Sequence, residues 1–407
     1  MEILAYAFPV FLILIGLEAF SLRANMNYKY RLNESLSNLS CGVFDQIINA
    51  FIGVIFIGVF AIIQINFGFF NFNPRSVLHW LLLLIAIDLT YYIFHRASHR
   101  INFLWATHVV HHQSEGYNLT VSLRQGTIAT WVTYMFYLPL ALIGFPAFMF
   151  LIVHGIFQLY QFIVHTHYLK SIGPFEKIIA SPRLHRVHHG QNQQYWDKNY
   201  GGLFIIWDKL FNSYKEPKEK IIYGITTGLR SWDPFWANIY YFKFLSKSVL
   251  KLKTFSDKIR FLFGPPGELQ RVVPPPKYSY GYDSQIQKEW RIYGILQLLF
   301  SIITGFFLVL YFNKINYIIS IPSAFIILLS ISNVNRLFDR RKEALITEKI
   351  KFILTLILTA ALIIKEIPFI PYIVLFLSIC FMVWFILIET KYPYQTTSKS
   401  FMIKNQP

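Results

Sequence analysis

The stretch HRASHRINFLWATHVVHH, residues 95–112, decides the character of this chain. It contains the pattern HxxxH and then the pattern HxxHH, formed by His95, His99, His108, His111 and His112. On an α-helix, residues i, i+3 and i+4 share one face with about 5–6 Å between their Cβ atoms, so each pattern presents imidazole rings together. Neutral imidazole is a common ligand of iron, zinc and copper. The stretch therefore predicts a metal site built on helices.

A second HxxHH pattern follows further along the chain, formed by His185, His188 and His189. The three groups together supply eight histidines, which are enough to surround two metal ions. No HExxH pattern occurs, which disfavours a zinc metalloprotease. The set is also richer in nitrogen than the three-ligand site of a hydrolytic zinc enzyme. The spacing therefore favours a dinuclear site.

Four histidines lie outside these groups. We expect His79, early in an apolar helix, to be structural. His154 lies in the middle of an apolar stretch, and both a functional role and a hydrogen bond in the core remain open for it. His165 and His167 follow that stretch and should lie at the depth of the metals.

The composition indicates an integral membrane protein. The chain has 407 residues, 55% of them hydrophobic and 18% aromatic, and several apolar stretches are long enough to cross a bilayer. The formal net charge of +17 fits cytosolic loops that face anionic lipid, and no nucleic-acid-binding motif accompanies it. The two cysteines, Cys41 and Cys380, lie far apart and argue against a disulfide framework or a thiolate metal site.

The predicted fold is all-α, a polytopic membrane protein with about nine transmembrane helices. We expect the first helix to be retained, because the start of the chain lacks the features of a cleaved signal peptide. Residues 128–164 should form two helices broken near Gly144-Phe145-Pro146, as a full or a re-entrant hairpin. The other helices are expected at residues 3–20, 47–70, 77–94, 293–312, 316–333, 351–365 and 369–388.

Basic residues predict which loops are cytosolic. Residues 165–292 hold 20 of the 38 Lys and Arg. This predicts an outer N-terminus, an inner C-terminus and three histidine groups that face the cytosol from a bacterial inner membrane or the endoplasmic reticulum. The expected parts are N-terminal membrane helices at 1–75, a histidine-rich di-metal domain at 76–215, a cytosolic linker region at 216–290 and C-terminal membrane helices at 291–407.

The patterns HRASH, HVVHH and HRVHH resemble the three histidine boxes of the fatty acid hydroxylase/sterol desaturase superfamily of membrane di-iron oxygenases. The flanking segments are similar to those of its alkylglycerol monooxygenase branch. These segments are YRLNESLSNLS (30–40), YNLTVSLRQ (117–125), LYQFIVHTHYLKSIGPFE (159–176), SPRLHRVHHGQNQQYWDKNYGGLFIIWDKLF (181–211), GPPGE (264–268) and DRRKEALITE (339–348). The resemblance thus extends over nearly the whole chain.

The resemblance implies that the eight box histidines hold two iron ions, with His165 as a further ligand or a neighbour of one. It implies an O2-dependent monooxygenase that hydroxylates the carbon next to the ether oxygen of an alkylglycerol, a membrane lipid, and so releases a fatty aldehyde. Animal members take electrons from tetrahydrobiopterin, which is therefore an implied cofactor. Arg100 and His167 stand where those members carry glutamate, so another donor, such as a redox partner protein, is the alternative.

Polar residues near the boxes are further candidates. We predict catalytic roles for Asn118, Asp197 and Asn199, and we consider Arg124 and Asp208 beside them. Each is equally a candidate for orienting a histidine or folding a loop.

Two other functions remain open at this point. A hydroxylase or desaturase of fatty acids or sterols, fed by a reductase chain, would carry the same boxes. The remote alternative is a non-catalytic metal-binding or metal-transport membrane protein, which would carry polar residues along several transmembrane helices. Residues 293–388 are mostly apolar, which disfavours that alternative.

Overall fold

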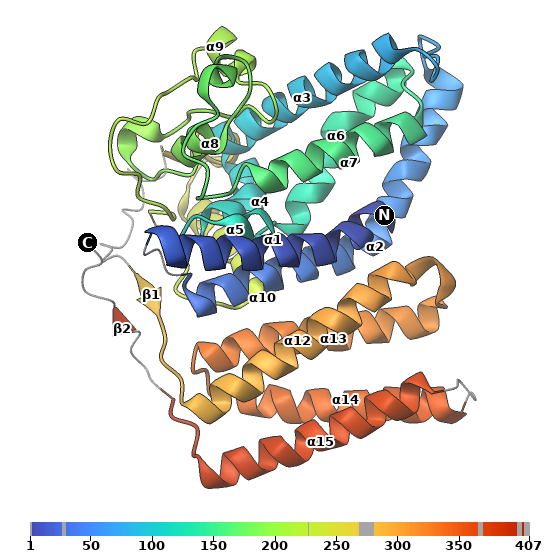
Figure 1. Cartoon of the computed structure of the whole chain (residues 1–407), viewed down its shortest axis with the longest axis vertical. Coiled ribbons are helices and arrows are strands. Elements are labelled where there is room, and N and C mark those ends of the chain that lie inside the picture. Colours follow the sequence, from blue (N-terminus) through green and yellow to red (C-terminus); the bar gives the residue numbers. More distant parts are fainter. Residues whose placement is uncertain are drawn as a thin grey trace. The chain divides into compact units, whose positions relative to one another are not determined.

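A computed structural model describes residues 2–26, 30–226, 228–267, 281–364, 369–396 and 401–402. The secondary structure of these residues is mainly helical (Figure 1), which confirms the all-α prediction. The named strands are one antiparallel pair, β1 (Tyr282–Asp283) and β2 (Phe401–Met402). The chain forms two compact units, unit 1 with residues 1–229 and 238–278, and unit 2 with residues 230–237 and 279–407.

Unit 1 contains the histidines. Its helices are α1 (Glu2–Met26), α2 (Leu32–Phe67), α3 (Val77–Arg100), α4 (Asn102–His112), α5 (Leu119–Ser122), α6 (Thr127–Ile143), α7 (Ala147–Ile163), α8 (Pro182–His188), α9 (Ile206–Leu210) and α11 (Phe255–Phe263), with the 3-10 helices η1 (Gly173–Lys177) and η2 (Gln193–Tyr195). Helix α10 (Pro234–Lys251) begins in unit 2 and continues in unit 1.

The core of unit 1 lies among α2, α3, α6 and α7, which contact one another along their apolar faces. Phe60, Leu83, Ile87, Tyr137 and Phe150 are almost completely buried there. Each fully buried large apolar side chain contributes about 1.5–3 kcal/mol relative to its exposed state. This packing holds the end of α3, where the first two box histidines lie, against the rest of the unit.

Two local features differ in how far the sequence predicted them. Helix α2 begins 15 residues before the predicted helix at 47–70, because the polar side chains of its first turns, such as Glu34, Asn38 and Asp45, are buried against the rest of unit 1. The break predicted near residue 144 is confirmed. Gly144 ends α6 with a φ of 115°, and a Cβ there would lie 1.9 Å from the carbonyl oxygen of Phe70.

Unit 2 consists mainly of four consecutive helices, each of which contacts the next. They are α12 (Lys288–Leu310), α13 (Tyr317–Phe338), α14 (Glu343–Ile364) and α15 (Ile370–Lys391), with the 3-10 helix η4 (Phe312–Lys314). Helix α14 begins eight residues before the predicted segment at 351–365. Its early charged residues Glu348 and Lys351 are buried and paired with each other at 2.5 Å, so the helix continues through them.

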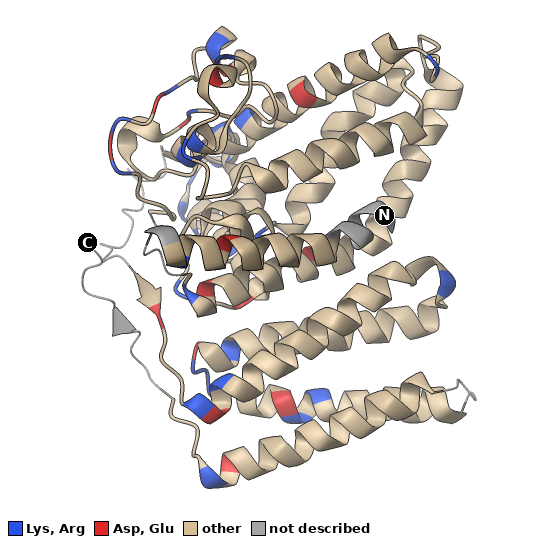
Figure 2. Cartoon of the chain, viewed as in Figure 1, with Lys and Arg blue, Asp and Glu red and all other residues tan. Residues whose placement is uncertain are grey.

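Within the described residues, five helices are long and apolar enough to cross a membrane, namely α2, α3, α12, α13 and α15. Helices α6 and α7 are shorter apolar helices. The membrane character is thus supported, but the number of nine spans is not confirmed. Figure 2 shows long stretches of these helices without charge, and Lys and Arg of unit 1 gathered around the segments that carry α8 and α9.

Candidate metal centre

Local sequence explains how the histidine-bearing helices begin and end. Helix α3 ends at Arg100 because Ile101 adopts an extended backbone, and α4 starts at the next residue. Ser181 caps α8 by accepting the N–H of Leu184 at 3.3 Å, and Pro182 occupies the first helical position, where its missing N–H has no cost. The HxxxH pattern therefore lies on α3, the first HxxHH pattern on α4 and the second at the end of α8.

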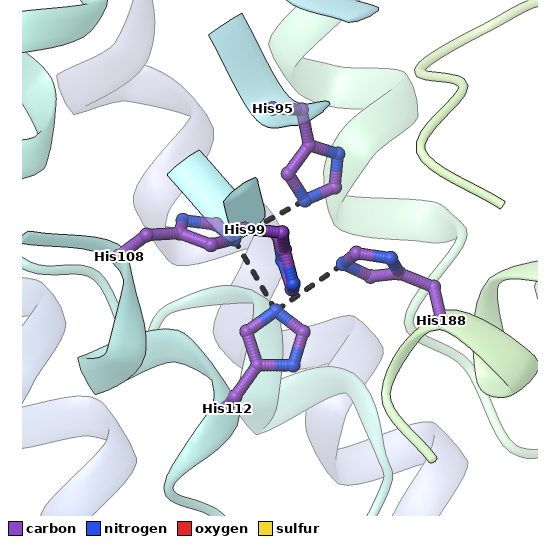
Figure 3. Close-up of side chains that lie close together, drawn as sticks. All are labelled: His95, His99, His108, His112 and His188. Carbon is purple, nitrogen blue, oxygen red and sulfur yellow. Dashed lines mark hydrogen bonds between the residues drawn. The ribbon is translucent and has the colours of Figure 1, made fainter. Parts of the chain in front are cut away.

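The nine predicted metal ligands come together in two buried or nearly buried groups. In each group the ligand atoms all lie within 4.8 Å of one another. The five-histidine cluster is His95, His99, His108, His112 and His188 (Figure 3). The four-histidine cluster is His111, His165, His185 and His189.

The ring nitrogens converge inside each cluster, and Figure 3 shows this for the five-histidine cluster. In the five-histidine cluster, Nε2 of His108 lies 3.1 Å from that of His95 and 3.2 Å from that of His112. In the four-histidine cluster, Nε2 of His165 lies 3.1 Å from that of His111 and 3.2 Å from that of His185. Such convergence of ring nitrogens suits a shared cation better than a set of mutual hydrogen bonds, because a neutral ring has only one N–H.

Backbone carbonyls take up the opposite nitrogen of four rings. Nδ1 of His95 donates to the carbonyl of Tyr200 at 2.8 Å, and Nδ1 of His188 donates to that of Lys198 at 3.0 Å. Nδ1 of His111 donates to the carbonyl of Arg124 at 3.1 Å and Nδ1 of His165 to that of Gln161 at 2.7 Å, because a carbonyl oxygen can only accept. A proton on Nδ1 leaves the Nε2 lone pair free, which is the usual arrangement of a metal-binding histidine.

Two further observations test the fit to metal ions. Nε2 of His99 and of His189 is buried and makes no hydrogen bond, one such atom in each cluster. An unpaired buried polar atom costs about 1–3 kcal/mol, and a metal bond would remove that cost. Burial also lowers the pKa of His111 to about 4 and that of His189 well below its ordinary value. The rings are therefore neutral at neutral pH, as ligands must be, and the donor sets fit a pair of metal ions.

The loop before and through α9 supports the five-histidine cluster from outside. The buried carboxylate of Asp208 accepts the N–H groups of Tyr200 at 2.8 Å and Gly201 at 2.7 Å, and the hydroxyl of Ser213 at 2.7 Å. The carbonyl of Tyr200 in turn accepts Nδ1 of His95. Asp208 thus holds the segment whose carbonyl contacts the ring of His95, and a role in orienting a metal ligand remains a prediction.

The three predicted catalytic residues lie around the clusters rather than inside them. Asn118 caps α5, with its Oδ1 accepting the N–H of Thr120 at 3.0 Å. Asn199 is 1% exposed, and its Nδ2 donates to the carbonyls of Leu184 and Lys215 at 2.9 and 2.8 Å. The bonds of Asn199 tie α8 to the chain that follows α9. Catalytic roles for both residues remain predictions.

Asp197, the third predicted catalytic residue, lies on a more exposed part of the loop. Its Oδ2 accepts from Arg100 at 2.6 Å, and its Oδ1 accepts from the hydroxyl of Tyr200 at 2.9 Å. Its φ is 57°, a left-handed conformation that aspartate tolerates better than most residues. The pair joins the end of α3 to the loop, and a catalytic role for Asp197 also remains a prediction.

Arg124 and two glutamates tie the first two helices to the segments that carry and follow the histidines of α4. The guanidinium of Arg124 donates to the carbonyl of Val110 at 2.8 Å and to Oδ1 of Asn38 at 3.1 Å. The carboxylate of Glu18 accepts the N–H groups of Leu119 and His167 at 2.8 and 2.7 Å, and Glu34 accepts backbone N–H groups of the segment after α4. The sequence interpretation missed both glutamates, although a carboxylate in a mainly apolar stretch is itself a signal of a buried partner.

The remaining histidines lie outside both clusters. Nδ1 of His79 accepts the N–H of Asn73 at 2.7 Å, a structural contact at the start of α3. The ring of His154 packs on the rings of Tyr137 and Phe150, with centroids 5.2 Å away in both cases. This environment is the apolar core of unit 1, and His154 belongs to neither cluster.

Comparisons with known proteins agree with this geometry. The family model described as fatty acid hydroxylase matches residues 80–213, which contain both clusters. Alkylglycerol monooxygenase of Xenopus tropicalis is 31% identical over 86% of this chain and 80% of its own length, and that of Homo sapiens is 30% identical over 81% and 76%. Ornithine lipid hydroxylase OlsE of Rhizobium tropici is 29% identical over 33% of this chain and 41% of its own.

No solved structure matches the chain. The sequence similarity nevertheless covers four fifths of the residues, including the regions outside the histidine boxes. The matched family model and these long alignments agree on one assignment. The chain belongs to the fatty acid hydroxylase family, and its relatives of high coverage are alkylglycerol monooxygenases.

Proposed function

We propose that this chain is a di-iron, O2-dependent monooxygenase that cleaves the ether bond of alkylglycerols. The two histidine clusters carry the proposal, because they offer adjacent nitrogen-rich sites for a pair of metal ions within one buried region. The relatives that bear the name alkylglycerol monooxygenase support the choice of an ether lipid as substrate.

The proposed reaction inserts one oxygen atom of O2 into the C–H bond next to the ether oxygen. The other oxygen atom leaves as water after a reductant has supplied a pair of electrons and a pair of protons has been taken up. The resulting hemiacetal breaks its C–O bond and gives a fatty aldehyde and the free alcohol of the glycerol. Iron, when bound, supplies the redox chemistry for cleaving O2.

The protein side chains hold the ligand nitrogens and keep water away from them. Backbone carbonyls set the protonation of four rings, as described above, and Asp208 fixes one of those carbonyls. Aromatic rings cover the clusters. The ring centroid of Trp105 lies 4.8 Å from that of His99, and the ring centroid of Tyr117 lies 5.3 Å from that of His189. An apolar wall of this kind limits side reactions with solvent. The lipid tail would lie among the apolar helices of unit 1, while its head reaches the clusters.

The electron donor and the membrane side belong to the same proposal. The basic residues between 165 and 292 favour a cytosolic active site, where soluble donors are available. Tetrahydrobiopterin is the first donor to test, and a redox partner protein is the second. Arg100 forms an ion pair with Asp197, so the position that carries glutamate in the animal enzymes serves here to join α3 to the loop.

A second candidate is hydroxylation of a lipid without ether cleavage. The similarity to the ornithine lipid hydroxylase favours it. That alignment covers a third of this chain, and the name of the enzyme describes the hydroxylation of a lipid. The two candidates share the metal centre and differ in the position of the attacked carbon. Product analysis therefore separates them.

The test is an assay of membranes that contain the full chain, with an alkylglycerol as substrate and fatty aldehyde as the measured product. The assay is run with and without tetrahydrobiopterin, and in parallel on a fatty acid, a sterol and an ornithine lipid. We expect aldehyde from the alkylglycerol only when O2 and a reductant are present. Hydroxylated product from another lipid, with no aldehyde, would move the assignment to the second candidate.

A matched pair of variants links the activity to the clusters. We expect His111→Ala to abolish turnover and to reduce bound iron, because its Nε2 belongs to the four-histidine cluster. The control His79→Ala removes a histidine whose ring contacts Asn73 outside both clusters, and it should retain activity and iron. Full activity with full metal content in His111→Ala would contradict the di-iron proposal.

A further inference from the structure

Helix α11 has three different sides. Its sequence FSDKIRFLF places Phe255, Ile259 and Phe263 one turn apart along one side. Phe261 and Leu262 lie on a second side and pack against a small core that includes residues of α4 and α10. The third side is polar. A helix that has one side packed on protein, one apolar side and one polar side suits the boundary between a membrane and water.

The apolar side of α11 is exposed in unit 1. Phe255, Ile259 and Phe263 are 77%, 41% and 58% exposed, and Leu250, just before the helix, is 80% exposed. Contiguous exposed apolar patches are uncommon on surfaces that face water, and they mark contact with a membrane or another protein. The patch therefore needs an occupant.

The charges around α11 favour an anionic occupant. Residues 243–260 contain six basic side chains and one acidic side chain, Asp257. The chain that leads into the helix and its polar side supply this charge, with Lys251, Lys253 and Arg260 all exposed. Basic residues beside an apolar face are the pattern of helices that lie on anionic lipid.

Hydrogen bonds set α11 at the level where a spanning helix ends. Helix α3, long and apolar enough to cross a membrane, ends at Arg100. Two residues later, the N–H of Asn102 donates to the carbonyl of Gly264 at 2.9 Å, and Nδ2 of Asn102 donates to the carbonyl of Phe261 at 3.0 Å. The C-terminal end of α11 therefore lies beside the point at which α3 leaves the apolar layer.

We propose that α11 lies flat in the headgroup region of the bilayer that the chain spans. Its apolar side enters the boundary of the acyl chains, and the neighbouring basic residues bind anionic headgroups. Its protein side rests on α4, the helix that carries three of the clustered histidines, so the membrane surface braces the wall of the metal centre. A protein partner or a second copy on this face is the competing outcome.

The test measures the depth of labelled positions in vesicles that contain the full chain. Cys41 is buried and Cys380 is exposed, so Cys380→Ser gives a background without a reactive thiol. Phe263→Cys on the apolar side and Asp257→Cys on the polar side then each carry an environment-sensitive fluorophore. The vesicles contain phosphatidylcholine with or without phosphatidylserine. Nitroxide lipids quench from the membrane, and iodide quenches from water.

We expect the label at position 263 to be quenched by nitroxide lipids at a depth of roughly 5–10 Å, and the label at 257 to be quenched by iodide. In vesicles with phosphatidylserine, Lys253→Glu combined with Arg260→Glu should weaken the nitroxide quenching at 263. All exchanged positions are exposed, and circular dichroism checks that each variant is folded. Iodide quenching at 263 equal to that at 257 would overturn the proposal and leave the face to a protein partner.

Discussion

Asp208→Asn is the substitution that best tests how the loop supports the metal centre. The aspartate side chain is completely buried, and its two oxygens accept three donors, the N–H groups of Tyr200 and Gly201 and the hydroxyl of Ser213. Asparagine has the same shape but only one acceptor oxygen. Its amino group would therefore face at least one backbone N–H that has no other partner in the native arrangement.

The size of the effect follows from these bonds. One buried donor left without a partner costs about 1–3 kcal/mol, so the free energy of unfolding should fall by that amount. The carbonyl of Tyr200, which accepts Nδ1 of His95 at 2.8 Å, would lose its fixed position. Changes to groups that orient a ligand histidine typically cost about 10–100-fold in metal affinity or activity, and we expect a loss of iron affinity in this range.

The assay is an iron titration of the purified protein, with metal content measured per chain, together with thermal unfolding. Asp339→Asn in unit 2 is the matched control. That aspartate is partly buried and also accepts three donors, Ser231 Oγ, the N–H of Trp232 and the hydroxyl of Tyr282, but no histidine of the clusters depends on it. It should lower the unfolding temperature and leave iron affinity unchanged.

The refuting result is equally specific. If Asp208→Asn and Asp339→Asn lose the same stability and both bind iron as the wild type does, then Asp208 only folds the loop. The contacts from Asp208 through Tyr200 to the ring of His95 would then contribute nothing to iron affinity. A loss of iron in both variants would instead indicate general unfolding.

Three further predictions follow from particular contacts. Gly202→Ala would put a Cβ 2.4 Å from Cζ of Phe157 and should cost about 1–3 kcal/mol in thermal unfolding, whereas Gly155→Ala, with no atom within 4 Å, should not destabilise; equal unfolding temperatures would contradict this. Lys351→Met should cost about 3–5 kcal/mol by leaving Glu348 buried without its cation, and unchanged stability would show that the pair is dispensable. Purified protein should contain about two iron ions per chain, one for each cluster, and stoichiometric zinc with no turnover after iron loading would favour an inert site.

The sequence predicted the local parts of the metal centre well, because helical spacing is a local property. In each HxxHH pattern the first and last histidines are four residues apart and share a face, with the middle one beside them. The structure keeps His108 with His112 in one cluster and His185 with His189 in the other, and it places each middle histidine in the opposite cluster. The hairpin break at Gly144 was also predictable, because glycine and proline close together are a local signal for the end of a helix.

The buried polar contacts were less accessible from the sequence. Glu18 and Glu34 lie more than 80 residues from the N–H groups that they accept after α4 and in α5, and no local pattern indicates such a pairing. The lengths of α2 and α14 were underpredicted because hydropathy counts a polar side chain as exposed. In the fold, these side chains find partners and the helices continue through them.

The sequence by itself determined that this is a helical, membrane-embedded chain with histidines in numbers and spacings that suit metal ions. Hydrophobicity, charge and helical period are properties of neighbouring residues, and they are readable without a fold. Only the tertiary structure decided which histidines share a site. His188 from α8 joins the histidines of α3, whereas His111 of α4 turns to His165 after α7, because the packing of the helices, not the spacing along them, sets the distances between ring nitrogens.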